Sequence, residues 1–228
     1  VVAHSDLEMV EYQCDIWLLD GDAAPRLLVG GPTVDSRPRW SPDGTRLAFL
    51  SNRAGKRQVF VLDMRGGEAW ALTAENEGVG AFTWSPDGAR IAYLARPAAA
   101  DAPKAGKAGR AHVTERLFYR FDGAPGFLPV APADSELYRV EAAAGAVPRA
   151  LTDRRGPDGD LFALSRQGRI AWTGFDDTQP LRSSTTTRLY AAPLAAGNLA
   201  AITNVTAGFD RNVGETAMSD TPMPRGGA

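Results

Sequence analysis

One ten-residue motif occurs twice in this chain, 44 residues apart. The first copy, Trp-Ser-Pro-Asp-Gly-Thr-Arg-Leu-Ala-Phe, occupies residues 40–49, and the second, Trp-Ser-Pro-Asp-Gly-Ala-Arg-Ile-Ala-Tyr, occupies residues 84–93. A shorter copy without the proline, Leu-Ser-Arg-Gln-Gly-Arg-Ile-Ala-Trp, occupies residues 164–172. Near-identical segments at a fixed period indicate a fold that is assembled from repeated structural units.

Two further elements recur in a fixed order with this motif. The first places a branched aliphatic residue beside an aromatic one, at residues 15–20, 58–63, 136–141 and 188–193. The second is a short apolar run, at residues 27–29, 71–73, 150–152 and 201–203. The motif occurs three times and the two further elements four times, always in the same order, which defines one structural unit of about 40 to 45 residues.

The residue types of this unit predict strands joined by tight turns. In Ser-Pro-Asp-Gly the proline presets φ for the second turn position, the aspartate suits the third, and the glycine can adopt the left-handed conformation. The apolar runs that follow, at 47–50 and 91–94, have the length of strands and are too short for helices. The two turns comprise Pro42, Asp43, Gly44, Pro86, Asp87 and Gly88.

A four-stranded antiparallel meander of this size is one blade of a β-propeller. We therefore expect an all-β chain that is a partial propeller, about four blades plus the start of a fifth. The expected blade repeats lie near 1–50, 51–95, 136–175 and 185–228. A β-sandwich does not require near-identical motifs at a fixed period, and the repeats of a β-helix are shorter.

The two motif tryptophans, Trp40 and Trp84, occupy the same place in the repeat. Aromatic side chains can stack on sugars or peptides, but a fixed place in a repeat favours a role in the blade core. We therefore predict that both indoles lie in the core.

Residues 96–135 interrupt the repeat with about one blade's length of extra chain. Residues 96–110 are rich in Ala, Gly, Pro and cations, which predicts a loop, and 113–123 alternate charges with aromatics before an Asp-Gly turn, which predicts a projecting hairpin. Arg116, Tyr119 and Arg120 on this hairpin are our candidates for contact with a substrate or a neighbouring domain. In the alternative reading, these arginines simply pair with nearby acids.

Charge and cysteine content restrict the classes of partner. The chain has 25 Lys and Arg against 27 Asp and Glu, so it offers no broad basic surface and we expect no nucleic-acid partner. No apolar run is long enough for a membrane helix, so we expect no membrane contact. With the single cysteine Cys14 no intrachain disulfide can form, and we expect a cytoplasmic location.

A search for catalytic and metal-binding patterns finds none. No serine stands in a Gly-x-Ser-x-Gly elbow, and the histidines His4 and His112 have no recognisable catalytic context. One cysteine and two distant histidines make no zinc pattern. We expect no catalytic residue, no metal and no cofactor in this chain.

Several segments resemble the N-terminal propeller of the prolyl-oligopeptidase family, in its acylaminoacyl-peptidase-like branch. The resemblance runs from about residue 11 to about residue 205, and it is carried by residues 11–17, 38–44, 47–53, 66–69 and 116–123. In that family the propeller covers an α/β-hydrolase domain with a Ser-Asp-His triad, admits short peptides and excludes folded proteins. The resemblance implies that this chain is the propeller portion of such a serine peptidase, whose hydrolase domain is absent from it.

Two functions follow from these patterns. In the first, the chain gates the access of short peptides to a hydrolase domain or chain, on which it docks. In the second, it is a stand-alone propeller like TolB that binds other proteins, because the Trp-Ser-Pro-Asp-Gly repeat also occurs in such propellers. An open propeller leaves unpaired strand edges, so self-association is a further expectation.

Overall fold

The computed structural model describes residues 2–5, 12–96, 135–152, 162–175, 187–195 and 202–208. These ranges contain fifteen strands and no helix, so none of them holds a helix that could cross a membrane. The expected all-β class is confirmed. The expected loop and hairpin of the inserted segment, apart from Arg96 and Ser135, and the start of a fifth blade lie outside the described ranges.

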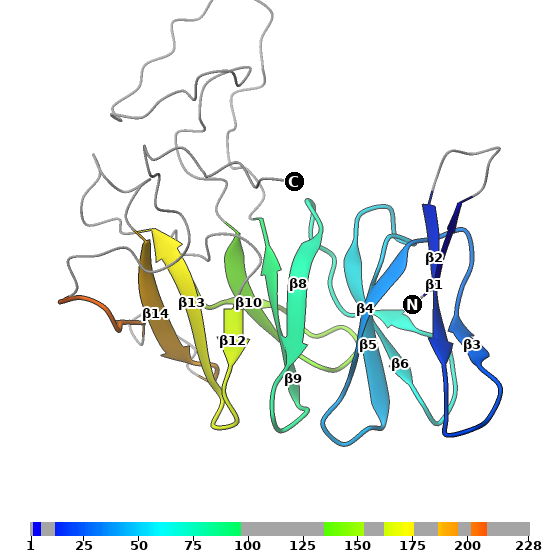
Figure 1. Ribbon diagram of the computed structural model, residues 1–228. Coiled ribbons are helices and arrows are strands. Elements are labelled where there is room, and N and C mark those ends of the chain that lie inside the picture. The colour runs from blue at the N-terminus through cyan, green and yellow to red at the C-terminus, as the bar shows by residue number, and fades with distance from the viewer. Residues whose placement is uncertain are drawn as a thin grey trace, which may run out of the picture.

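The strands form four antiparallel sheets that stand side by side as successive blades of a partial propeller (Figure 1). The first sheet has the order β1-β2-β3 and comprises Val2–Ser5, Tyr12–Leu18 and Arg26–Val29. The second has the order β4-β5-β6-β7 and comprises Asp35–Trp40, Arg46–Ser51, Gln58–Asp63 and Trp70–Ala71. The third has the order β8-β9-β10-β11 and comprises Val79–Trp84, Arg90–Ala95, Glu136–Glu141 and Arg149–Ala150. The fourth has the order β12-β13-β14-β15 and comprises Phe162–Leu164, Arg169–Phe175, Thr187–Pro193 and Thr203–Asn204.

The Ser-Pro-Asp-Gly turns join the first two strands of the second and third sheets. The N–H of Gly44 donates to the carbonyl of Ser41 (2.8 Å), and the N–H of Gly88 donates to that of Ser85 (2.9 Å). The two glycines have φ values of +70° and +67°, in the left-handed region that the motif predicts. Gly168, with φ +72°, closes the same turn in the fourth sheet without the proline.

The sheet boundaries differ from the blade repeats expected near 1–50, 51–95, 136–175 and 185–228. A boundary at residue 50 would separate β5 from β6, although these strands pair residue by residue from Arg46↔Asp63 to Ser51↔Gln58. The strands before and after the inserted segment, β9 and β10, also belong to one sheet, because they pair with each other. Each Ser-Pro-Asp-Gly turn connects two strands of one sheet. The boundary between two sheets therefore does not fall directly after the strand that follows the turn.

The core lies between neighbouring sheets, in three clusters of buried apolar side chains. One cross-strand aromatic pair recurs in the second, third and fourth sheets, with ring centroids 5.4–6.0 Å apart. These pairs are Phe49–Phe60, Tyr93–Tyr138 and Trp172–Tyr190. In these three sheets the aromatic residue at the end of the repeated motif therefore packs against an aromatic residue of the next strand.

The two motif tryptophans have different surroundings. Trp84 is 7% exposed, its Nε1 donates to the carbonyl of Arg39 (3.1 Å), and the guanidinium of Arg46 lies 4.9 Å from its ring centroid. Trp40 is 47% exposed, so its predicted place in the core is wrong. Among the described residues, no arginine lies over the Trp40 ring as Arg46 does over Trp84.

Arg46 also connects the second sheet to the third. Its Nη2 donates to the carbonyl of Gly88 (2.7 Å) and its Nη1 to the carbonyl of Ala142 (2.9 Å). One side chain of β5 thus satisfies two carbonyls of the neighbouring blade and covers Trp84. Arg46 is thus an inter-blade contact, whereas Arg90, at the same place in the second copy of the motif, pairs with Glu141 of its own sheet (2.7 Å).

Candidate binding pocket between the second and third sheets

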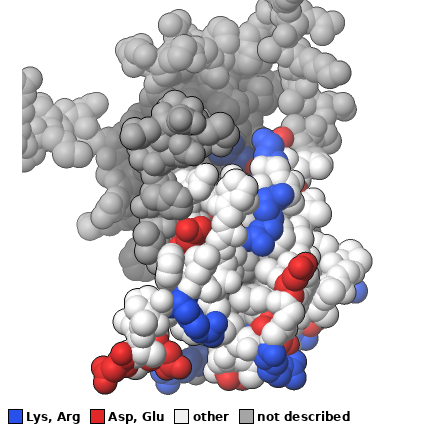
Figure 2. Space-filling model, turned by 90° about the vertical axis from the view of Figure 1, so that its right-hand side faces the viewer, with Lys and Arg blue, Asp and Glu red and all other residues white. Residues whose placement is uncertain are grey.

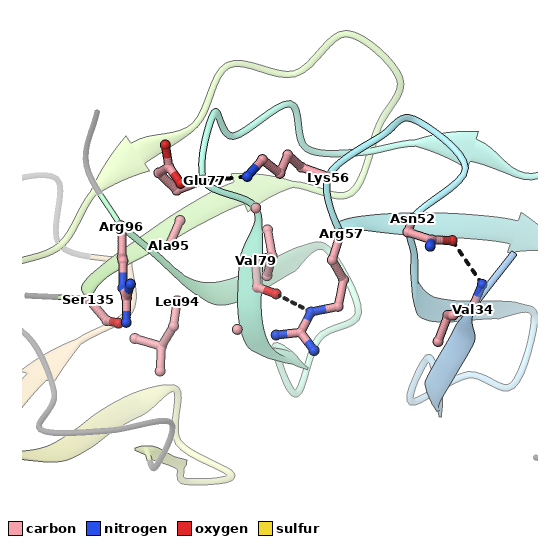
Figure 3. A pocket seen from close by; sticks show the side chains of 12 residues that line it. Val34, Asn52, Lys56, Arg57, Glu77, Val79, Leu94, Ala95, Arg96 and Ser135 are labelled. Atoms are coloured by element: carbon pink, nitrogen blue, oxygen red, sulfur yellow. Dashed lines mark hydrogen bonds and ion pairs between the residues drawn. The ribbon is translucent and has the colours of Figure 1, made fainter. Parts of the chain in front are cut away.

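A pocket of about 540 Å³ opens between the second and third sheets (Figure 3). It lies at the Ser51 end of β5, and the Ser-Pro-Asp-Gly turn lies at the other end of that strand. Its volume is in the range of small-ligand sites, roughly 300 to 1,000 Å³. The lining residues are Val34, Asn52, Lys56, Arg57, Glu77, Gly78, Val79, Gly80, Leu94, Ala95, Arg96 and Ser135.

Arg57 is held against β8 through both its backbone and its side chain. The N–H of Val79 donates to the carbonyl of Arg57 (2.7 Å), and Nε of Arg57 donates to the carbonyl of Val79 (2.9 Å). Within the described part of the chain, neither Nη1 nor Nη2 of Arg57 forms a hydrogen bond. The end of the guanidinium therefore remains available to a ligand.

A glycine makes this close approach possible. Gly78 has a φ of +79°, and a Cβ on it would lie 2.9 Å from the carbonyl oxygen of Arg57. Any other residue would push the β5–β6 turn away from β8. Gly78 thus fixes the place of Arg57 in the pocket wall.

An ion pair between the partly exposed Arg53 and the buried Asp35 holds the β5–β6 turn in place. Nη2 of Arg53 donates to both carboxylate oxygens of Asp35 (3.0 and 3.1 Å), and the Asp35 side chain is 0% exposed. Nε of Arg53 donates to Oγ of Ser51 (2.9 Å). The turn that carries Lys56 and Arg57 is therefore anchored to β4.

The pocket has an excess of positive charge. Lys56 and Glu77 form an ion pair (Nζ to Oε2, 3.8 Å) and offset each other. Arg96 is exposed and, as far as the chain is described, has no ion-pair or hydrogen-bond partner. Figure 3 shows its side chain beside Ser135, across the pocket from Arg57. Two guanidinium groups thus face the pocket, and the one carboxylate among the described lining residues, Glu77, is paired with Lys56.

A polar network next to the pocket has a structural role. The hydroxyl of Tyr93 donates to Oε1 of Glu75 (2.6 Å), and Nε2 of Gln58 donates to the carbonyl of Glu75 (2.7 Å). Burial, together with this hydrogen bond, raises the pKa of Tyr93 far above its usual value. The phenol stays protonated at neutral pH and cannot act as a base.

The described residues contain no cluster of three or more His, Cys, Asp or Glu that could hold a metal ion. Of the two histidines, His4 lies in β1 and His112 lies outside the described ranges. The candidate contact residues Arg116, Tyr119 and Arg120 also lie outside them. Their predicted role remains a prediction.

The pocket residues were not predictable from the repeated motif, because all of them lie outside its copies. One signal was available in the segment 52–57, Asn-Arg-Ala-Gly-Lys-Arg, where half of a six-residue turn is cationic. Arg96 carries no such signal, because only the pairing of β9 with β10 brings Arg96 and Ser135 together at the pocket.

Comparison with known proteins supports the propeller fold, and the matching proteins include both peptidases and TolB proteins. Residues 9–113 match the TolB beta propeller domain family. A segment of 70 residues, 29% of this chain, is 39% identical to the uncharacterized peptidase YuxL of Bacillus subtilis. Another of 55 residues, 24% of this chain, is 42% identical to a TolB homolog of Chlorobium luteolum. The chain covers 10% and 13% of the lengths of these two relatives.

Among solved structures, a protein described as a TolB of Agrobacterium tumefaciens matches with a TM-score of 0.50. The match covers 89% of this chain and 59% of that one, at 18% sequence identity. An identity this low supports the propeller fold and says nothing about a shared activity. The chain is thus related to the propellers of peptidases and to TolB alike.

Proposed function

We propose that this chain is the non-catalytic propeller portion of a serine oligopeptidase resembling acylaminoacyl-peptidase. In this role it gates the access of short peptides to an α/β-hydrolase domain, on which it docks. The pocket between the second and third sheets is the observation that carries the proposal. Its volume of about 540 Å³ suits part of a short peptide, and its arginines offer donors to a peptide's oxygens.

The position of the pocket fits this role. The segment 97–134 leaves the third sheet after Arg96 and returns at Ser135, and both residues line the pocket. Arg116, Tyr119 and Arg120 of this segment are the candidates for contact with a hydrolase domain. A peptide bound in the pocket would then lie beside the connection to the catalytic partner.

An activity-based probe tests the proposal directly. We expect a serine-reactive fluorophosphonate to leave this chain unlabelled, and acyl-peptide chromogenic substrates to remain intact when incubated with it. Hydrolysis is expected once a hydrolase domain encoded with the propeller is present, and prior treatment of that domain with the probe is the matched control. Covalent labelling of this chain itself would contradict the proposal.

The second candidate function is a TolB-like propeller that binds proteins and has no hydrolase partner. The 42% identity to a TolB homolog favours it. The gene that encodes this chain, read past the codon for Ala228, separates the two. A Gly-x-Ser-x-Gly elbow with an aspartate and a histidine supports the peptidase, and a coding sequence without them supports the binding protein.

A further inference from the structure

Arg57 has the geometry of a carboxylate receptor. Its Nε is occupied by the carbonyl of Val79 (2.9 Å), which fixes the plane of the guanidinium and leaves the two Nη groups pointing away from that bond. Two parallel N–H donors at the end of a planar guanidinium match the two oxygens of a carboxylate. Because Gly78 and the Val79 N–H hold the backbone of Arg57, little conformational entropy is lost on binding.

The rest of the pocket restricts what carries that carboxylate. Among the described residues, Arg96 supplies a second positive charge that has no ion-pair partner, while Lys56 and Glu77 offset each other (3.8 Å). Val34, which is partly exposed, adds apolar surface to the pocket wall, whereas Val79 and Leu94 also line the pocket but are each 1% exposed. A fully hydrated anion such as phosphate would leave this apolar surface unused, whereas a carboxylate attached to an apolar group uses both parts of the wall.

We propose that the pocket binds a carboxylate of a short peptide, with Arg57 as the bidentate donor and Arg96 as the second cation. The carboxylate is either the peptide's C-terminus or an acidic side chain. The inference rests on the proposed function for its ligand class, a peptide. It assigns this chain a part in substrate selection, in addition to restricting access by size.

Isothermal titration calorimetry on the full chain tests this with three probes. They are acetyl-Ala-Ala-Leu with a free carboxylate, the same peptide as its C-terminal amide, and acetyl-Ala-Glu-Leu amide. We expect the free acid to bind at least about 10-fold more tightly than the neutral amide, because charge-assisted bidentate bonds are lost with the carboxylate. Binding of the glutamate-containing amide shows that a side-chain carboxylate is also accepted, and its failure to bind assigns the site to the C-terminus.

Variants locate the site. Arg57→Lys keeps the charge but removes the planar donor pair, and we expect the affinity for the free acid to fall about 10-fold, with a similar fall for Arg96→Gln. Arg149→Gln, which removes an exposed arginine from the outer strand β11, is the matched control and should bind as the wild type does. Circular dichroism melts of each variant check that the fold is unchanged.

Three results would overturn the inference. They are equal binding of the acid and the neutral amide, wild-type affinity in both pocket variants, and displacement of the acid by inorganic phosphate at the same concentration as by the acid itself. The assay contains no hydrolase domain. Carboxylate binding therefore stands if no catalytic partner is found, and it fails alone if a partner is found and the acid does not bind.

Discussion

At the scale of single residues, Trp84 owes its burial to contacts from two strands of the second sheet. Arg39 accepts its indole N–H and Arg46 covers its ring. We expect Trp84→Ala to lower the free energy of unfolding by about 3 to 5 kcal/mol, as a large-to-small core substitution does. Urea unfolding monitored by circular dichroism measures the change.

Trp40→Ala is the matched control, since Trp40 has the same place in the motif but is 47% exposed. We expect its effect to stay below about 1 kcal/mol. Equal decreases in the free energy of unfolding of Trp84→Ala and Trp40→Ala would show that Trp40 is as buried in solution as Trp84.

The carboxylate of Asp43 is the second residue with a distinct prediction. The hydroxyl of Ser41 (2.6 Å), the N–H of Thr45 (3.1 Å) and the hydroxyl of Thr45 (2.9 Å) donate to it, and they lower its pKa to about 2. Because the folded pKa lies below the model-peptide value of 3.8, the ionised turn stabilises the fold at neutral pH. This contribution is lost as the pH falls from about 4 through about 2.

A carboxyl ¹³C NMR titration checks this prediction. We expect Ser41→Ala to raise the pKa of Asp43 toward its ordinary value, because the largest stabilising hydrogen bond is gone. Ser85→Ala removes the equivalent donor from Asp87 in the next blade and should leave Asp43 unchanged. An Asp43 pKa that is the same in Ser41→Ala as in the wild type would contradict the assigned cause.

At the scale of the elements, the left-handed glycine of the β4–β5 turn is open to a clean test. Gly44 has a φ of +70°, and a Cβ on it would meet no atom within 4 Å. The cost of a side chain there is therefore one of backbone conformation alone. We expect Gly44→Val to destabilise the protein by about 1 to 3 kcal/mol, measured by thermal or urea unfolding.

Gly44→Asn provides the comparison, because asparagine tolerates positive φ better than β-branched residues do. Its loss of stability should be clearly smaller than that of the valine variant. If Gly44→Val and Gly44→Asn lowered the free energy of unfolding equally, steric crowding by the new side chain, and not the positive φ, would be the cause.

In the fourth repeat, the threonine that follows the outer strand is not the one that the sequence pattern predicts. A threonine hydroxyl after the outer strand accepts the N–H of Val59 in the second sheet and of Leu137 in the third. In the fourth sheet the N–H of Leu189 donates to Thr206 (3.1 Å), three residues after the threonine of the predicted 201–203 element. Residues 201–203, Ala-Ile-Thr, are followed directly by residues 204–206, Asn-Val-Thr. The sequence pattern does not distinguish the two threonines, and only the register of β14 with β15 places the second one at the N–H of Leu189.

The repeated strands and turns were predictable because hydrophobic pattern and turn chemistry are local. The burial of a motif residue was not, since Trp84 and Trp40 share one motif and differ in the neighbouring sheet that faces them. The pocket was not predictable either, because its guanidinium groups come from two sheets. Arg57 reaches it from a turn and Arg96 from a strand end.

At the scale of the whole molecule, the first and fourth sheets lie at opposite ends of the row, so the described blades do not close a ring (Figure 1). Ile16 and Val29 of the first sheet are buried against the second sheet. Trp17 and Leu27, which pair across β2 and β3, are 43% and 50% exposed. Figure 2 shows this end of the molecule, where uncharged surface lies between scattered charged side chains.

We expect this apolar surface to make the chain self-associate as its concentration rises, which light scattering after size-exclusion chromatography measures. A double variant, Trp17→Ser with Leu27→Ser, should shift the population toward monomer. Val147→Ser changes an 80% exposed apolar residue near the third sheet and is the control that should leave the mass unchanged. A chain that is monomeric at all concentrations would contradict the prediction.

The pairing of β9 with β10 has an evolutionary and practical consequence. In the second sheet six residues connect the corresponding strands, and in the third sheet 40 residues do, yet the ladder from Glu136↔Ala95 to Glu141↔Arg90 has no shift. Closing the longer connection costs only about 2 kcal/mol more, because loop entropy grows with the logarithm of length. This junction can therefore gain, lose or exchange whole segments while the blade keeps its register, which makes it a natural position for grafting foreign peptides onto the scaffold.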